Sequence, residues 1–119
     1  TQLQDTVQRL YASGAREVHM RPACPPLLYP CEFLNFSRTR TAMALAARRA
    51  IREIEGRDDV DPAEYCQNGS KHDAMVDRVR GRLNLTTLRY QSMCDMVAAI
   101  GLPKNRLCTH CWDASSITR

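Results

Sequence analysis

Residues 13–23 read SGAREVHMRPA, and this stretch decides the fold. The residues before it form an amphipathic segment in which Leu3, Val7 and Leu10 recur at helical spacing. Glycine commonly ends a helix because it adopts a left-handed backbone conformation at little cost. We therefore predict a first helix that ends at Ser13-Gly14.

A short strand is predicted directly after this glycine, over residues 17–23. Val18 and Met20 would face one side of it, and Pro22 ends it because proline cannot donate to a strand ladder. A helix, a glycine and a strand form the second half of a β-α-β unit, so the sequence predicts an α/β fold. We expect the first strand of the unit to precede Thr1, which would make this chain a piece of a larger domain.

Hydrophobic spacing divides the rest of the chain into further elements. Helices are predicted over residues 39–55, 71–83 and 92–100, and a short strand over 85–90. Residues 24–37 are predicted to form a proline-rich loop, and residues 56–70 a polar connection with one helical turn. In the helix over 39–55, the predicted buried face consists of Ala42, Met43, Ala46, Ala50, Ile51 and Ile54. In the helix over 71–83, it consists of Ala74, Met75, Val76, Val79 and Leu83. The arginines of the helix over 39–55 are predicted to form a solvated basic face rather than a phosphate site; they are Arg40, Arg48, Arg49 and Arg52.

Length and composition exclude several classes of protein. The chain has 119 residues, 44% hydrophobic and 25% charged, which fits one globular domain or a part of one and excludes collagen-like and wholly disordered proteins. Its net charge of +4 comes without a basic patch interleaved with aromatic residues, so we predict no nucleic-acid partner. No apolar run could span a bilayer and no signal peptide is visible, so we predict a cytoplasmic protein without a membrane partner.

Six cysteines are the most informative feature of the composition. In a reducing compartment they are metal ligands, redox groups or buried free thiols rather than disulfides. The motif Cys108-Thr-His-Cys111 is the strongest local signal, because two thiolates three residues apart can bind one metal ion. It leaves four interpretations open: an iron–sulfur cluster, zinc, a redox pair, or unliganded thiols. Cys31, held between a proline and a glutamate, is the best third ligand, and Cys24, His110 or a residue outside the chain could be the fourth.

The remaining candidates for chemistry are predicted to be structural. Cys66 falls in a turn that we expect to be exposed, and Cys94 falls on a helix where we expect it to be a small core residue. His19 and His72 are predicted to be structural or solvated. Trp112 could shield a metal site from water or simply anchor the end of the chain. The sequence holds no Ser-His-Asp arrangement, HExxH, Walker loop or GxGxxG, so no self-sufficient active site is predicted.

Four motifs together resemble the C-terminal part of the glutamine phosphoribosylpyrophosphate amidotransferases (amidophosphoribosyltransferases). They are GAREVHMR at 14–21, PACPPLLYPC at 22–31, LTTLRYQSMCDMVAAIG at 85–101 and LCTHCWD at 107–113. They occur in the family's order, whereas residues 56–80 diverge. Cys24 stands where the family commonly has serine, and Cys94-Asp95-Met96 replaces the family's Glu-Gly-Leu element.

The resemblance implies an incomplete type I phosphoribosyltransferase-like domain over residues 1–119. The family makes 5-phosphoribosylamine from phosphoribosylpyrophosphate and glutamine-derived ammonia, the first step of purine synthesis, with Mg²⁺. Its glutaminase nucleophile and phosphoribosylpyrophosphate loop would lie in the remainder of the enzyme, so no catalytic residue is predicted here. The partners implied are that remainder, with its N-terminal glutaminase domain, and further copies of the enzyme in a homo-oligomer.

The same resemblance implies a [4Fe-4S] cluster, because many members of the family bind one through four cysteines. By the motifs, Cys31, Cys108 and Cys111 would be three of the ligands, and the fourth would come from a region before this chain. The site would be built from residues 24–37 and 107–113. The alternative from another class is a non-enzymatic zinc or iron–sulfur module that binds a larger partner.

Overall fold

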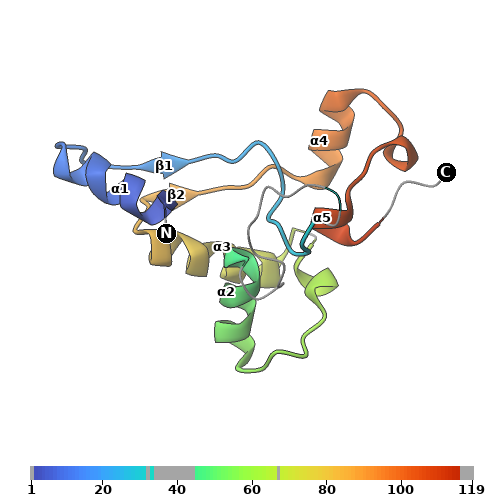
Figure 1. The fold of residues 1–119 in the computed structure, drawn as a ribbon, viewed down its shortest axis with the longest axis horizontal. Coiled ribbons are helices and arrows are strands. Elements are labelled where there is room, and N and C mark those ends of the chain that lie inside the picture. The colour runs from blue at the N-terminus through green and yellow to red at the C-terminus, as the bar shows by residue number, and fades with distance from the viewer. Residues whose placement is uncertain (1, 32, 34–44, 67, 116–119) are drawn as a thin grey trace.

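The structure is a computed structural model that describes residues 2–31, 33, 45–66 and 68–115. In chain order its elements are α1 (Gln2–Ala12), β1 (His19–Met20), α2 (Ala46–Glu55), η2 (Pro62–Tyr65), α3 (Ser70–Leu83), β2 (Thr87–Leu88), α4 (Met93–Ile100), η3 (Lys104–Arg106) and α5 (His110–Asp113). Helix α1 and the two strands lie at one end of the molecule, and α4 and α5 lie at the other (Figure 1).

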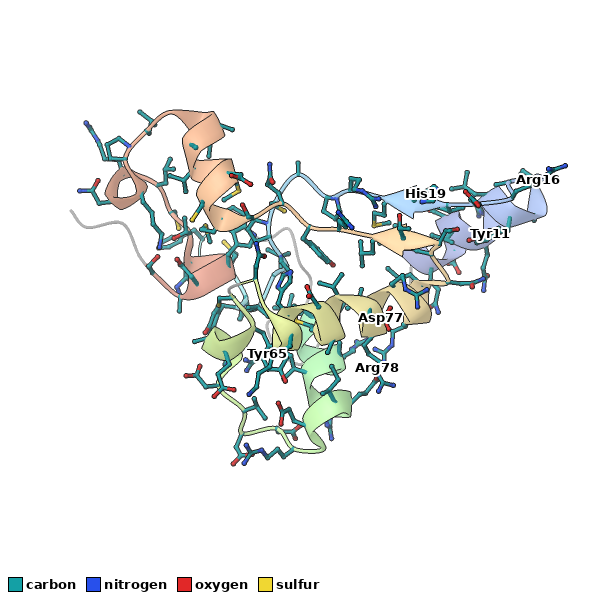
Figure 2. The ribbon with its side chains drawn as sticks, turned by 180° about the vertical axis from the view of Figure 1, so that it is seen from behind. Tyr11, Arg16, His19, Tyr65, Asp77 and Arg78 are labelled. Carbon is teal, nitrogen blue, oxygen red and sulfur yellow. The ribbon has the colours of Figure 1, made fainter. Side chains whose placement is uncertain are left out.

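The two strands pair in parallel, with His19 opposite Thr87 and Met20 opposite Leu88. Alternate residues of a strand face opposite sides. Leu88 is buried in the core that includes Val79 of α3, whereas the His19 ring is exposed and its Nδ1 lies 2.8 Å from Thr87 Oγ1. Figure 2 shows His19 at the same end of the molecule as α1. The sheet therefore has one apolar face on α3 and one polar face.

Helices α2 and α3 form the centre of the core. Met75 is 0% exposed on α3, and Ala50 and Ile51 face it from α2 as buried residues. Fully burying a side chain of this size contributes about 1.5–3 kcal/mol to stability. The core cluster comprises Val7, Leu28, Ala47, Ala50, Ile51, Val60, Tyr65, Met75, Val79, Leu85 and Leu88.

Helix α1 is attached to the end of α3. Val7 is buried in the common core, and the Tyr11 hydroxyl donates to Asn84 O at 2.8 Å. Leu3 and Leu10 keep 43% and 45% of their surface exposed. The helical spacing that predicted α1 is therefore confirmed, with only the middle of its apolar face covered.

The predicted ends of two helices are confirmed by their geometry. Gly14 has φ +103°, and its N–H donates to Tyr11 O at 3.0 Å, which closes α1. Helix α4 begins after Ser92, whose hydroxyl accepts from Asp95 N at 3.1 Å. Such a side-chain cap satisfies one of the free N–H groups of the first turn.

Other predictions needed correction in detail. The helix predicted over 39–55 is confirmed from Ala46 onward, and residues 39–44 lie outside the described residues. Ala46, Ile54 and Ala74 were predicted to face the core but are exposed. Both strands are only two residues long.

The helices and the short parallel sheet are compatible with the α/β class, and the phosphoribosyltransferase-like topology stays a prediction. In the part of the chain that is described, no helix is long and apolar enough to cross a membrane.

Candidate metal centre

The proline-rich segment and α5 are joined by their backbones. Leu28 N and Tyr29 N both donate to Cys111 O, at 2.9 and 3.0 Å. Leu28 is 1% exposed, so this segment is also anchored in the core. Pro25 and Pro26 before it are buried as well and restrict its backbone. The arrangement brings Cys31 next to Cys111, although the two are far apart in the sequence.

The thiols of Cys31 and Cys111 are hydrogen-bonded to each other. The pKa of Cys111 is raised to about 11, first by burial and then by the hydrogen bond and the negative charge of Cys31, with a smaller contribution from Cys108. Cys31 and Cys108 therefore both lie close enough to Cys111 for their charges to raise its pKa. A bound cation would reverse this effect, because coordination favours the thiolate.

The side chains do not form a complete ligand set as they lie. Among the described residues, no group of three or more His, Cys, Asp or Glu side chains is arranged to hold a metal ion. Cys108 is exposed, whereas Cys31 and Cys111 are half-buried. Two of the predicted ligands are thus in contact, and the third lies nearby on the exposed side.

The two candidates for a fourth ligand within the chain have other neighbours in the structure. Cys24 is half-buried, and its charge raises the pKa of Tyr90, which burial raises more strongly. This places Cys24 beside the segment between β2 and α4. The His110 ring packs on Tyr29, with 6.1 Å between ring centroids. His110 thus lies closer to the 28–31 segment than the sequence alone could indicate.

Cys66 was predicted to lie in an exposed turn, and that prediction is wrong. Its Sγ is half-buried and donates to Trp112 O at 3.2 Å and, more weakly, to Pro62 O at 3.6 Å. Burial raises the pKa of this thiol, and the charge of Asp113 raises it further. Cys66 therefore fastens η2 to α5.

Cys94 was predicted to be a small core residue, and it is exposed instead. Met96 is the residue of α4 that is buried. Cys94 lines a cavity of about 540 Å³ that lies between α4 and α5. The other residues around this cavity are Cys66, Asn68, Ser92, Met93, Lys104 and Asp113.

A carboxylate outside the predicted ligand set stabilises the turn that carries the CTHC motif. Asp113 accepts hydrogen bonds from Thr109 Oγ1 at 2.9 Å and from Ser115 N at 3.0 Å, and pairs with Lys104 at 2.6 Å. Burial alone would raise the pKa of Asp113, but the hydrogen bonds from Lys104, Ser115 and Thr109 hold it well below its usual range. Its spacing of four residues from Thr109 was the signal in the sequence.

The other histidines have structural partners, as predicted. His72 Nδ1 lies 3.2 Å from Tyr65 O, and His19 bridges Thr87 and Glu17 on the polar face of the sheet. Figure 2 shows Tyr65 near the start of α3, far from His19.

Comparison with known proteins finds relatives that share one name. The amidophosphoribosyltransferases of Mycobacterium tuberculosis and Mycobacterium bovis are each 34% identical to it over 108 residues, which is 90% of this chain and 16% of the relative. The amidophosphoribosyltransferase of Methanothermobacter thermautotrophicus is 26% identical over 101 residues. The chain thus spans about one-sixth of the length of the curated relatives it matches.

No family model and no solved structure matches the chain. The sequence similarity nevertheless extends over nine-tenths of the chain. The chain is therefore a relative of one part of the amidophosphoribosyltransferases, as its motifs predicted.

Proposed function

We propose that this chain is part of an amidophosphoribosyltransferase and that Cys31, Cys108 and Cys111 are ligands of its [4Fe-4S] cluster. The observation that carries the proposal is the direct contact of the Cys31 and Cys111 thiols, held by the two backbone hydrogen bonds to Cys111 O. Thiolates are the ligands that iron–sulfur clusters use. The sequence similarity supports the enzyme class, and the thiols support the cluster. The fourth ligand would come from the rest of the protein, with Cys24 and His110 as the alternatives within this chain.

The proposed role of this piece is structural. The full enzyme would make 5-phosphoribosylamine from phosphoribosylpyrophosphate and glutamine-derived ammonia with Mg²⁺, using residues outside this chain. When bound, the cluster would link the 28–31 segment to α5 by metal–thiolate bonds, and such bonds contribute directly to folding stability. Residues 24–37 and 107–113 would form the site, and the rest of the chain would hold them in place.

The test is to purify the full-length protein without oxygen and measure its iron, acid-labile sulfide and zinc. We expect near-equal iron and sulfide with a broad brown absorbance, and loss of both in Cys108→Ser. Cys94→Ser is the matched control, because Cys94 is exposed on α4. Full iron and unchanged thermal stability in Cys108→Ser would rule out the cluster role.

One zinc and no sulfide would instead favour a non-enzymatic zinc module. The observation that keeps this second candidate open is the position of His110, which lies between the two cysteines of the motif and packs on Tyr29. In that case His110→Ala should lower the zinc content, whereas His72→Ala should not.

A further inference from the structure

The last turn of α4 is apolar on every side. Residues 97–100 read Val-Ala-Ala-Ile, and four consecutive residues complete one turn of a helix. Ala98 and Ala99 are exposed, and Ile100 keeps 50% of its surface in solvent. A helix that is apolar all round is normally enclosed by protein. The end of α4 therefore lacks a covering surface among the described residues.

This apolar surface continues past the end of the helix. Leu102 follows the helix-ending Gly101 and is 51% exposed, and no charged side chain occurs from residue 96 to residue 103. The α4 patch comprises Ala98, Ala99, Ile100 and Leu102. Ile54 of α2 provides a contrast, because it is 37% exposed but lies between Glu53 and Glu55. A single apolar side chain on a charged surface needs no partner, whereas a contiguous apolar patch marks an interaction site.

The core of the described residues does not extend to the α4 patch. Helix α4 lies at the end of the molecule opposite α1, away from the pair α2 and α3 that forms the centre of the core (Figure 1). Met96 is the buried residue of α4. Burial of the helix thus stops one turn before Ile100.

The size of the α4 patch favours a covering surface within the same polypeptide. A specific interface between separate molecules buries about 800 Å² on each partner, and one helical turn with one further leucine is far smaller. A small apolar contact suffices between parts of one chain, because linkage keeps their effective concentration high. The chain spans about one-sixth of the length of its curated relatives, so the proposed parent protein has ample residues to supply that surface.

We propose that the α4 patch docks on an apolar surface of the remainder of the protein, outside these 119 residues. This inference rests on the part of the proposed function that makes the chain a piece of a larger enzyme, and it is independent of the cluster. Helix α4 leads through η3 into α5. The contact would therefore hold the end of the molecule that carries the CTHC motif.

The test is photo-crosslinking in the full-length protein, with p-benzoylphenylalanine in place of Leu102 and mass spectrometry of the cross-linked peptides. We expect this probe to cross-link, within one polypeptide, to an apolar peptide outside the 119 residues. The same probe in place of Ile54 should give no such product. Adding Ile100→Lys should abolish the cross-link, because docking would bury an unpaired charge, whereas adding Ile54→Lys should leave it unchanged.

The remaining outcomes would overturn the inference. Cross-links between two copies, seen as a covalent dimer, would assign the α4 patch to a second copy. Cross-links confined to these 119 residues, or no cross-link, would show that the remainder does not cover it. Iron and sulfide measured on the same preparations keep the two proposals apart. Full iron and sulfide without the expected cross-link would overturn the inference alone, and the cross-link in a protein without iron and sulfide would overturn the cluster role alone.

Discussion

The buried hydroxyl of Tyr65 joins two elements of the structure. The side chain is 1% exposed, and its hydroxyl donates to Glu55 Oε1 at 2.5 Å. Burial, followed by the hydrogen bond and the charge of Glu55, raises its pKa from 10.0 to about 12. The bond joins η2 to the end of α2, so it holds the segment that leads to Cys66.

Replacing this residue, Tyr65→Phe, is predicted to change the pH dependence of stability. Because the folded pKa of Tyr65 is raised, its contribution is fully present below pH 10 and is lost as the pH rises from 10 toward 12. The wild type should therefore lose more stability than Tyr65→Phe on crossing this range. Below pH 10 the variant should be less stable by about 1.5–3 kcal/mol, the usual contribution of a hydrogen bond to a charged group.

Urea unfolding measured below and above pH 10 checks this prediction. Tyr11→Phe is the matched control, since its hydroxyl bonds to a backbone carbonyl rather than to a carboxylate. An equal flattening of the pH profile by both variants would contradict the assigned role of Tyr65.

Single residues also show where sequence reasoning reaches its limit. Cys31, Cys108 and Cys111 could be selected because proline context and CxxC spacing are local signals. Cys66 could not, because its partner, Trp112 O, lies at the far end of the chain. Arg48 was assigned to solvent because a helical pattern treats every charge as exposed, whereas the Tyr29 ring covers it.

At the scale of elements, the packing of α2 on α3 is the main source of stability. Met75 lies in this contact and is 0% exposed. The ion pairs of Glu53 with Arg78 and Arg82 join the same two helices at the surface, where such pairs contribute little. The apolar contact, rather than these charges, holds the helices together.

The variant Met75→Ala is predicted to destabilise the protein by about 2–5 kcal/mol, because it removes buried atoms and leaves a cavity. Thermal and urea unfolding provide the measurement. Ala74→Ser, a neighbouring change on the exposed side of α3, should change stability by no more than about 0.5 kcal/mol. A small effect of Met75→Ala would mean that α2 and α3 are held by other contacts.

The longer helices were predictable from the sequence, whereas η3, α5 and the lengths of the strands were not. Apolar spacing, Ser92 and Gly101 indicated where helices begin and end, and such signals lie within one element. The extent of β1 and β2 depends instead on how long two distant segments remain side by side. Propensity predicted longer strands over 17–23 and 85–90, but pairing extends over only two residues in each.

At the scale of the whole molecule, two of the long-range connections lie at opposite ends. One is the sheet, at the end that carries α1, and the other is the junction of the 28–31 segment with α5, at the opposite end (Figure 1). The helices α2 and α3 lie between them. The proposed cluster would reinforce only the second connection.

Removing the cluster is therefore predicted to act at one end of the molecule. In the full-length protein, chelation of iron should speed hydrogen exchange of the Leu28 and Tyr29 amides, which donate to Cys111 O. Amides in the middle of α3 should keep their protection, because that helix is held by the core. Hydrogen exchange measured by mass spectrometry before and after chelation tests this, and equal protection of the 28–31 segment in both states would contradict it.

The parallel pairing of β1 with β2 also has a consequence for how the chain acquires its structure. His19 and Thr87 are 68 positions apart, whereas α2 and α3 are neighbours along the chain. Contacts between distant positions slow folding because the intervening chain must first lose its freedom. The helix pair can therefore assemble early and locally, and the sheet must wait until β2 has been synthesised. During translation, β1 remains without its partner until almost three-quarters of these residues have been made.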